Sequence, residues 1–108
     1  MSNLTERHCN PCKAGTPPLH GEAIQSLLSG LEGWAVVDEH HLEKEYRFKD
    51  FVEALLFVNR LGGVAEAEGH HPDVVLTWGR VKVTLWTHSV GGLSENDFIF
   101  AAKADAVL

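Results

Sequence analysis

Two short strand-like runs, residues 74–78 and 81–88, are separated by only two residues, Gly79 and Arg80. In the second run, valine and leucine take every second position, which is the period of a strand with one buried face. A two-residue connection that begins with glycine is typical of a type II′ turn, which joins antiparallel strands. This stretch therefore predicts an antiparallel β-hairpin, and the rest of the chain must cover one of its faces.

The remaining sequence predicts three helices and two more strands. Apolar residues recur three and four positions apart in the helical segments, and the longer strand alternates. Asp50 and Ser94 are suited to cap the second and third helices, and Gly69 to end the second. The predicted helices span residues 21–31, 51–68 and 95–105, and the strands span residues 34–37 and 42–48. On the second helix, the side chains expected to face the core are Phe51, Ala54, Leu55, Val58, Leu61 and Ala65.

The order α-β-β-α-β-β-α indicates the α+β class. We expect a two-layer sandwich, with a four-stranded antiparallel sheet and three helices on one face. At 108 residues, the chain has the length of one domain. Residues 1–19, rich in proline and glycine, predict an irregular N-terminal arm, and residues 20–108 a single domain.

Charge and hydropathy exclude several classes of protein. Nine lysines and arginines stand against fifteen aspartates and glutamates, so the net charge is 9 − 15 = −6 with histidine neutral. Such a domain is poorly suited to bind nucleic acid or an anionic membrane surface. No apolar run approaches the ~18–20 residues of a membrane span. The polar N-terminus has no apolar signal-peptide centre, so we expect a cytoplasmic protein.

Cys9 and Cys12 are the only cysteines, which rules out a disulfide framework. Prolines and a glycine follow them and no strand precedes them, which disfavours a thioredoxin-like redox role. A second interpretation is half of a zinc site, completed by His8 or His20. The default interpretation is that the two cysteines belong to an unstructured or simply packed arm.

Seven histidines are unusual for a chain of this length, and their placement points to the functional region. His70 and His71 precede Pro72, which holds the chain extended at a helix–strand junction. An unperturbed histidine titrates near pH ~6.5, so it exchanges protons at neutral pH. Glu66 lies one helical turn before His70, and His88 ends a predicted strand. Taken singly, each of these also fits an ordinary solvated residue.

Five further residues could belong either to a functional site or to ordinary structure. Asp97 either closes a capping box at the third helix or supports a site. Trp78 and Trp86 either stack on a flat heterocycle or belong to the core or to an interface. His40 and His41 lie in a predicted turn beside acidic residues, where we expect them to be solvated.

The combination of these residues is more specific than any one of them. It consists of Glu66, His70, His71, Pro72, Trp78, His88 and Asp97. This set resembles the signature of the pterin-4a-carbinolamine dehydratases, also called 4a-hydroxytetrahydrobiopterin dehydratases. The resemblance runs from about residue 20 to residue 104 and leaves the arm with its cysteines outside.

The resemblance implies a four-stranded antiparallel sheet with helices on one side, assembled as a homodimer or homotetramer. It implies an enzyme that removes water from a 4a-hydroxytetrahydropterin substrate to give the quinonoid dihydropterin, without a cofactor or a metal. That reaction recycles the tetrahydrobiopterin used by aromatic amino-acid hydroxylases, the implied pathway partners. The implied catalytic residues are His70, His71 and His88. Glu66, Pro72, Trp78, Trp86 and Asp97 are expected to bind the substrate or support the site.

The reaction needs a proton delivered to the departing hydroxyl at C4a and a proton removed from N5, which histidines can do. Because Glu66 stands one turn before His70, we expect His70 and His88 to exchange these protons and His71 mainly to bind the pterin. One alternative is a protein-binding adaptor, since the family includes a member that stabilises dimers of a homeodomain transcription factor. A metal enzyme is another, disfavoured by the lack of a His-x-x-x-His pair or a second Cys-x-x-Cys.

Overall fold

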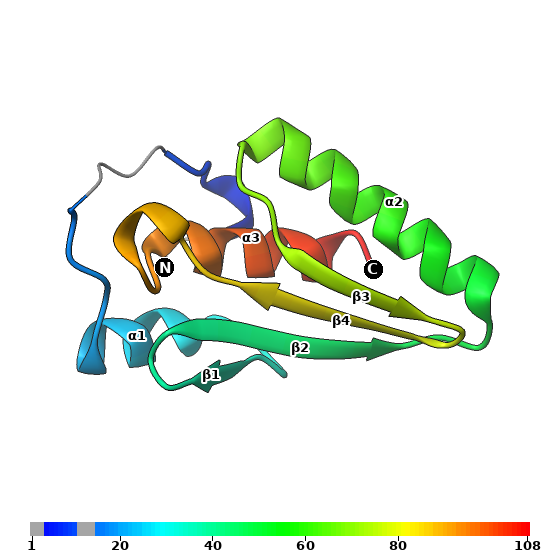
Figure 1. The fold of residues 1–108 in the computed structure, drawn as a ribbon, viewed down its shortest axis with the longest axis horizontal. Coiled ribbons are helices and arrows are strands. Elements are labelled where there is room, and N and C mark those ends of the chain that lie inside the picture. The colour runs from blue at the N-terminus through cyan, green and yellow to red at the C-terminus, as the bar shows by residue number, and fades with distance from the viewer. Residues whose placement is uncertain (1–3, 11–14) are drawn as a thin grey trace.

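A computed structural model describes residues 4–10 and 15–108, and these residues form four strands, three α-helices and two short 3-10 turns (Figure 1). The strands are β1 (Ala35–Val37), β2 (His41–Arg47), β3 (Asp73–Thr77) and β4 (Arg80–Leu85). The helices are α1 (Gly21–Leu28), α2 (Phe51–Glu68) and α3 (Glu95–Ala106), and the 3-10 turns are η1 (Leu4–Glu6) and η2 (His88–Val90). The predicted order of helices and strands is confirmed.

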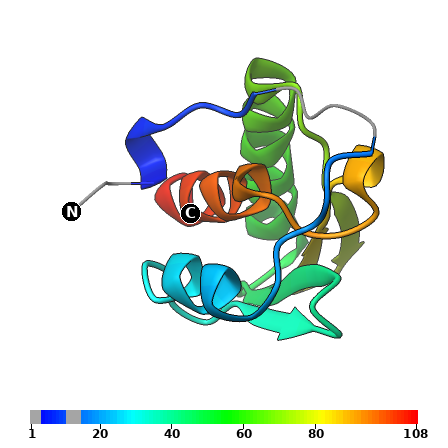
Figure 2. The ribbon, with the colours of Figure 1, turned by 90° about the vertical axis from the view of Figure 1, so that its left-hand side faces the viewer.

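The four strands pair antiparallel in the order β1-β2-β4-β3, with the helices packed on one face (Figure 2). Along β4, Val81, Val83 and Leu85 are fully buried, whereas Lys82 is exposed. The predicted two-layer α+β sandwich is therefore confirmed, because alternation along the central strands directs every second side chain into the single core.

The hairpin turn differs from its prediction. Thr77 pairs with Arg80, so the two connecting residues are Trp78 and Gly79. Neither of them adopts a positive φ, so the expected type II′ turn is wrong. Glycine is required here for another reason, since a Cβ on Gly79 would lie 3.0 Å from the Phe48 carbonyl oxygen. The Phe48 N–H also donates to the Gly79 carbonyl at 2.8 Å, which ties the turn to the chain after β2.

Helix α2 begins and ends as predicted, and its buried face matches the prediction in part, since Ala54, Leu61 and Ala65 are buried. The Asp50 carboxylate accepts from the backbone N–H of the third helical residue at 2.9 Å, and Gly69 ends the helix in the left-handed conformation. Phe51 and Leu55, predicted to face the core, are exposed, whereas Phe57 is fully buried. Apolar residues surround most of α2, so periodicity alone does not identify the inward stripe. In the described part of the chain, neither α2 nor any other helix is long and apolar enough to cross a membrane.

The carboxylate of Asp105 attaches α3 to the sheet. It accepts hydrogen bonds from the Trp34 indole N–H at 3.1 Å, the Lys44 ammonium at 2.8 Å and the Tyr46 hydroxyl at 2.5 Å. Burial, reinforced by this carboxylate, raises the pKa of Tyr46 well above its ordinary value. These contacts set the position of α3, whose first turn carries Asp97.

We expect Asp105→Ala to lower the free energy of unfolding by roughly 1–3 kcal/mol, because the Tyr46 hydroxyl and Trp34 indole lose their acceptor. Asp105→Asn keeps an acceptor oxygen and should cost less. Urea denaturation of both variants measures the difference. Equal stability of Asp105→Ala and the unaltered protein would contradict this role.

Candidate active site

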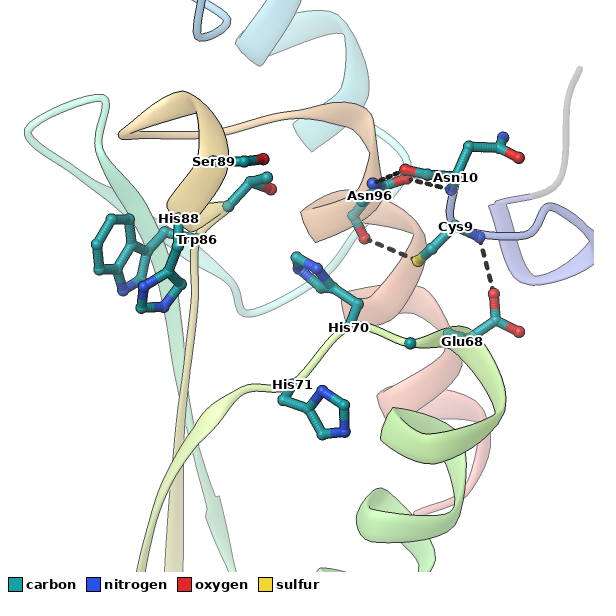
Figure 3. Close-up of a pocket in the computed structure, with 11 residues that line it drawn as sticks. Cys9, Asn10, Glu68, His70, His71, Trp86, His88, Ser89 and Asn96 are labelled. Atoms are coloured by element: carbon teal, nitrogen blue, oxygen red, sulfur yellow. Dashed lines mark hydrogen bonds between the residues drawn. The ribbon is translucent and has the colours of Figure 1, made fainter. Parts of the chain in front are cut away.

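A pocket of about 490 Å³ lies between the end of α2, the turn η2 and the start of α3 (Figure 3). His70 and His71 line it from the connection between α2 and β3, and Trp86 and His88 from the chain that follows β4. Of the residues predicted for the site, the structure thus brings these four to one cavity. A volume of this size lies within the ~300–1,000 Å³ of typical small-molecule sites.

His70 is held from behind by a buried carboxylate. Its Nε2 lies 2.7 Å from Oδ1 of Asp97, and the side chains are 12% and 0% exposed. The other Asp97 oxygen accepts from the Thr87 hydroxyl at 2.8 Å and from the Ser94 N–H at 2.9 Å. Asp97 therefore closes the predicted capping box of α3 and at the same time contacts His70. Because a carboxylate oxygen only accepts, Nε2 is the protonated nitrogen, and Nδ1 is left for a ligand.

Glu66 supports a different histidine from the one expected. Its carboxylate lies 2.5 Å from Nε2 of His71, and the side chains are 80% and 61% exposed. The expectation that Glu66 and His70 lie on one helix face is wrong, because Gly69 turns the chain out of the helix before His70. The four-residue relation places side chains on one face only while the helix continues. Pro72 then leads the chain into β3.

His88 belongs to a stack of aromatic rings. The strand β4 ends at Leu85, so His88 begins η2 and does not end a strand as predicted. Its ring stacks on Trp86 with centroids 3.8 Å apart and planes inclined by 26°. On the same indole, the ring of His40 packs at 4.5 Å. His40 was expected to be solvated, but it is half-buried, because the β1–β2 turn comes to lie beside the residue that follows β4.

Trp78 does not reach this pocket. It is exposed at the β3–β4 turn, at the opposite end of β3 from His71 (Figure 1). The structure therefore gives Trp86, and not Trp78, the position of an aromatic wall within one chain.

Comparison with known proteins decides the family. The sequence profile described as pterin 4 alpha carbinolamine dehydratase matches residues 17–107. The chain belongs to this family of pterin dehydratases. It is accordingly an enzyme of the hydro-lyase class, as the resemblance in the sequence implied.

Similar proteins cover almost the whole chain. A relative from Rubrobacter xylanophilus, named for pterin-4-alpha-carbinolamine dehydratase, is 55% identical over 97% of this chain and 98% of its own. One of the same name from Vibrio cholerae is 50% identical over 96% of this chain and 98% of its own. A Brucella melitensis structure described as a transcriptional coactivator/pterin dehydratase superposes with a TM-score of 0.78 at 36% identity. It covers 82% of this chain and 96% of its own.

Several pocket residues of this pterin dehydratase had no signal in the sequence. They are Asn10, Glu68, Thr87, Ser89 and Asn96, and Cys9 joins them, since none of its interpretations in the sequence placed it at the pocket. No spacing rule relates the arm to α2 or α3, so only the folded chain could reveal them. The zinc interpretation for the arm cannot be followed to Cys12, which lies outside the described residues. Within residues 4–10 and 15–108, no group of three or more His, Cys, Asp or Glu side chains is arranged to hold a metal ion.

We expect Asp97→Ala to lower the free energy of unfolding by about 2–4 kcal/mol, because three buried or partly buried donors lose their acceptor. Glu66→Ala is the matched control, since it also removes a carboxylate paired with a histidine, but at an exposed position. Its effect should stay within about 0.5 kcal/mol. Thermal and urea denaturation compare the two. Similar losses from both variants would contradict the central position of Asp97.

Proposed function

We propose that this protein removes water from a 4a-hydroxytetrahydropterin to give the quinonoid dihydropterin, with histidines as general acid and base. The observation that carries the proposal is the meeting of His70, His71 and His88 in one pocket, with Asp97 fixing the first of them. Family membership adds the substrate class.

The chemistry asks for two proton transfers and no change of oxidation state. The C4a–O bond breaks as the hydroxyl oxygen takes a proton and leaves as water, while a base removes the proton from N5. An imidazole pair can supply both functions, and one positioned group typically contributes ~10²–10⁴ in rate. A buried carboxylate behind His70 fixes its tautomer and ring orientation, leaving Nδ1 for the transfer.

We assign proton exchange to His70 and His88 and substrate binding mainly to His71. Glu66 does not distinguish His70, because its carboxylate contacts His71. His70 and His88 are the histidines whose rings are held in place. Asp97 holds His70 by a hydrogen bond, and Trp86 holds His88 by stacking. His71 and its partner are both exposed, which suits a residue that meets the pterin as it enters.

We expect His70→Ala and His88→Ala to lower kcat by ~10²–10⁴, whereas His71→Ala mainly raises KM. A phenylalanine hydroxylase reaction generates the 4a-hydroxypterin in situ, and its decay is followed in the ultraviolet. His20→Ala is the control, because the ring of that histidine pairs with the exposed Glu39 side chain and does not line the pocket. An equal loss of kcat in His71→Ala, with KM unchanged, would refute the assignment of roles. No acceleration by the folded unaltered protein would refute the function.

A second candidate is an adaptor that binds another protein. It is favoured by exposed apolar side chains on α2, which are Phe51, Val52, Leu55 and Leu56. The Brucella melitensis relative is described as a coactivator as well as a dehydratase. Two results together would favour the adaptor. The protein would lack dehydratase activity, and it would capture a stoichiometric partner protein that the Leu56→Glu variant fails to capture.

The same apolar stripe supports our proposal that the chain forms a homodimer or homotetramer, because self-association would remove that surface from water. Light scattering measures the oligomeric state directly. Two predictions from the sequence stay predictions. One is that the protein regenerates the cofactor of an aromatic amino-acid hydroxylase, and the other is that it acts in the cytoplasm.

A further inference from the structure

The N-terminal arm reaches the pocket although it precedes the region that matches the family. The match to the family profile begins at residue 17. Cys9 and Asn10 nevertheless line the same cavity as His70 and His71. Figure 2 shows the segment after η1 crossing the end of α2. The resemblance in the sequence had left the arm outside the catalytic core, whereas the structure places part of it at the pocket.

Two side chains of the domain hold the arm at this place (Figure 3). The Glu68 carboxylate accepts from the Cys9 N–H at 2.8 Å and lies 3.0 Å from Nδ1 of His8. The Asn96 amide makes two bonds to the backbone of Asn10, accepting from its N–H at 3.0 Å and donating to its carbonyl at 2.6 Å. These bonds are made mainly to the backbone, so they fix the path of the chain.

The electrostatics of Glu68 favour this attachment. Burial by itself raises the pKa of that carboxyl, but the Cys9 N–H, His8 and the nearby Lys103 ammonium outweigh it and hold the pKa below its ordinary value. The carboxylate is therefore ionised at neutral pH and remains a strong acceptor. Further along, Leu4 is buried and the Lys103 ammonium donates to the Thr5 carbonyl at 3.0 Å, which anchors the other end of the segment.

Both attachment points adjoin the pair at the centre of the site. Glu68 is two residues before His70, and Asn96 is one residue before Asp97. The arm thus bridges the two segments that bring His70 and Asp97 together. Between these anchors, the Cys9 thiol donates to the Asn96 carbonyl at 3.6 Å on the wall of the pocket.

We propose that Cys9 and Asn10 form a wall of the pocket that contacts the bound pterin, with Cys9 as its substrate-facing side chain. This inference rests on the proposed function, because it takes the pterin to be the ligand. The thiol is suited to an uncharged heterocycle, since burial and neighbouring carboxylates raise the pKa of Cys9 to about 12 and keep it neutral. The wall acts on substrate binding and takes no part in proton transfer.

Protection of Cys9 by a bound ligand tests the contact without relying on activity. In Cys12→Ser protein, Cys9 is the single cysteine, and its reaction with methyl methanethiosulfonate is followed by mass spectrometry. Biopterin, a stable pterin without the 4a-hydroxyl, serves as the ligand. At ten times its Kd, biopterin should slow the reaction roughly tenfold, because only the free protein reacts.

A cysteine placed elsewhere is the matched control. Ser26→Cys added to the Cys12→Ser protein puts a second thiol on the exposed side of α1, and biopterin should not change the rate at this position in the same molecule. Saturable binding of biopterin with an unchanged rate at Cys9 would overturn the wall and leave the proposed function intact. No binding of biopterin at all would overturn both.

A change in the size of Cys9 supplies the kinetic test. We expect Cys9→Phe to raise KM roughly tenfold with kcat changed by less than about twofold. Glu6→Phe adds the same bulk at an exposed arm position and should have no effect. An unchanged KM in Cys9→Phe would overturn the proposal, whether or not the arm stays in place.

Discussion

The buried carboxylate of Asp97 is the interaction on which the site depends. It accepts hydrogen bonds from His70, from the Thr87 hydroxyl and from the Ser94 N–H. In this way it joins the end of α2, the end of β4 and the start of α3. Burying a carboxylate costs free energy unless its oxygens accept hydrogen bonds. Because the three donors come from three segments, satisfying Asp97 holds these segments together. The pocket is the space between them.

This arrangement separates a restrained part of the pocket from a solvent-facing part. His70 cannot rotate without leaving Asp97, whereas His71 is exposed beside an exposed carboxylate. His88 is exposed too, but its stack on Trp86 limits its movement. One immobile imidazole beside more accessible ones suits a reaction in which the proton must be aimed while the substrate enters from solvent. Cys9 and Asn10 of the arm line the same pocket.

Local patterns predicted the parts of the fold that rest on near neighbours. The order of elements and the caps at Asp50 and Ser94 follow from hydrogen bonds and spacings within four residues. The inward face of α2 was predictable only in part, because packing against the rings of Tyr46 and Phe48 selects Phe57. The partner of Glu66 was not predictable either, since it depends on the left-handed turn at Gly69.

The sequence by itself determined the α+β class, the antiparallel hairpin and the set of histidines available for chemistry. Only the tertiary structure decided which carboxylate orients which histidine, and that the arm lines the pocket. The physical reason is the range of the contacts. Caps and alternation involve close neighbours along the chain, whereas His70 and Asp97 are 27 positions apart, and Cys9 and Glu68 are 59 apart. Such pairs meet only when the helices pack on the sheet.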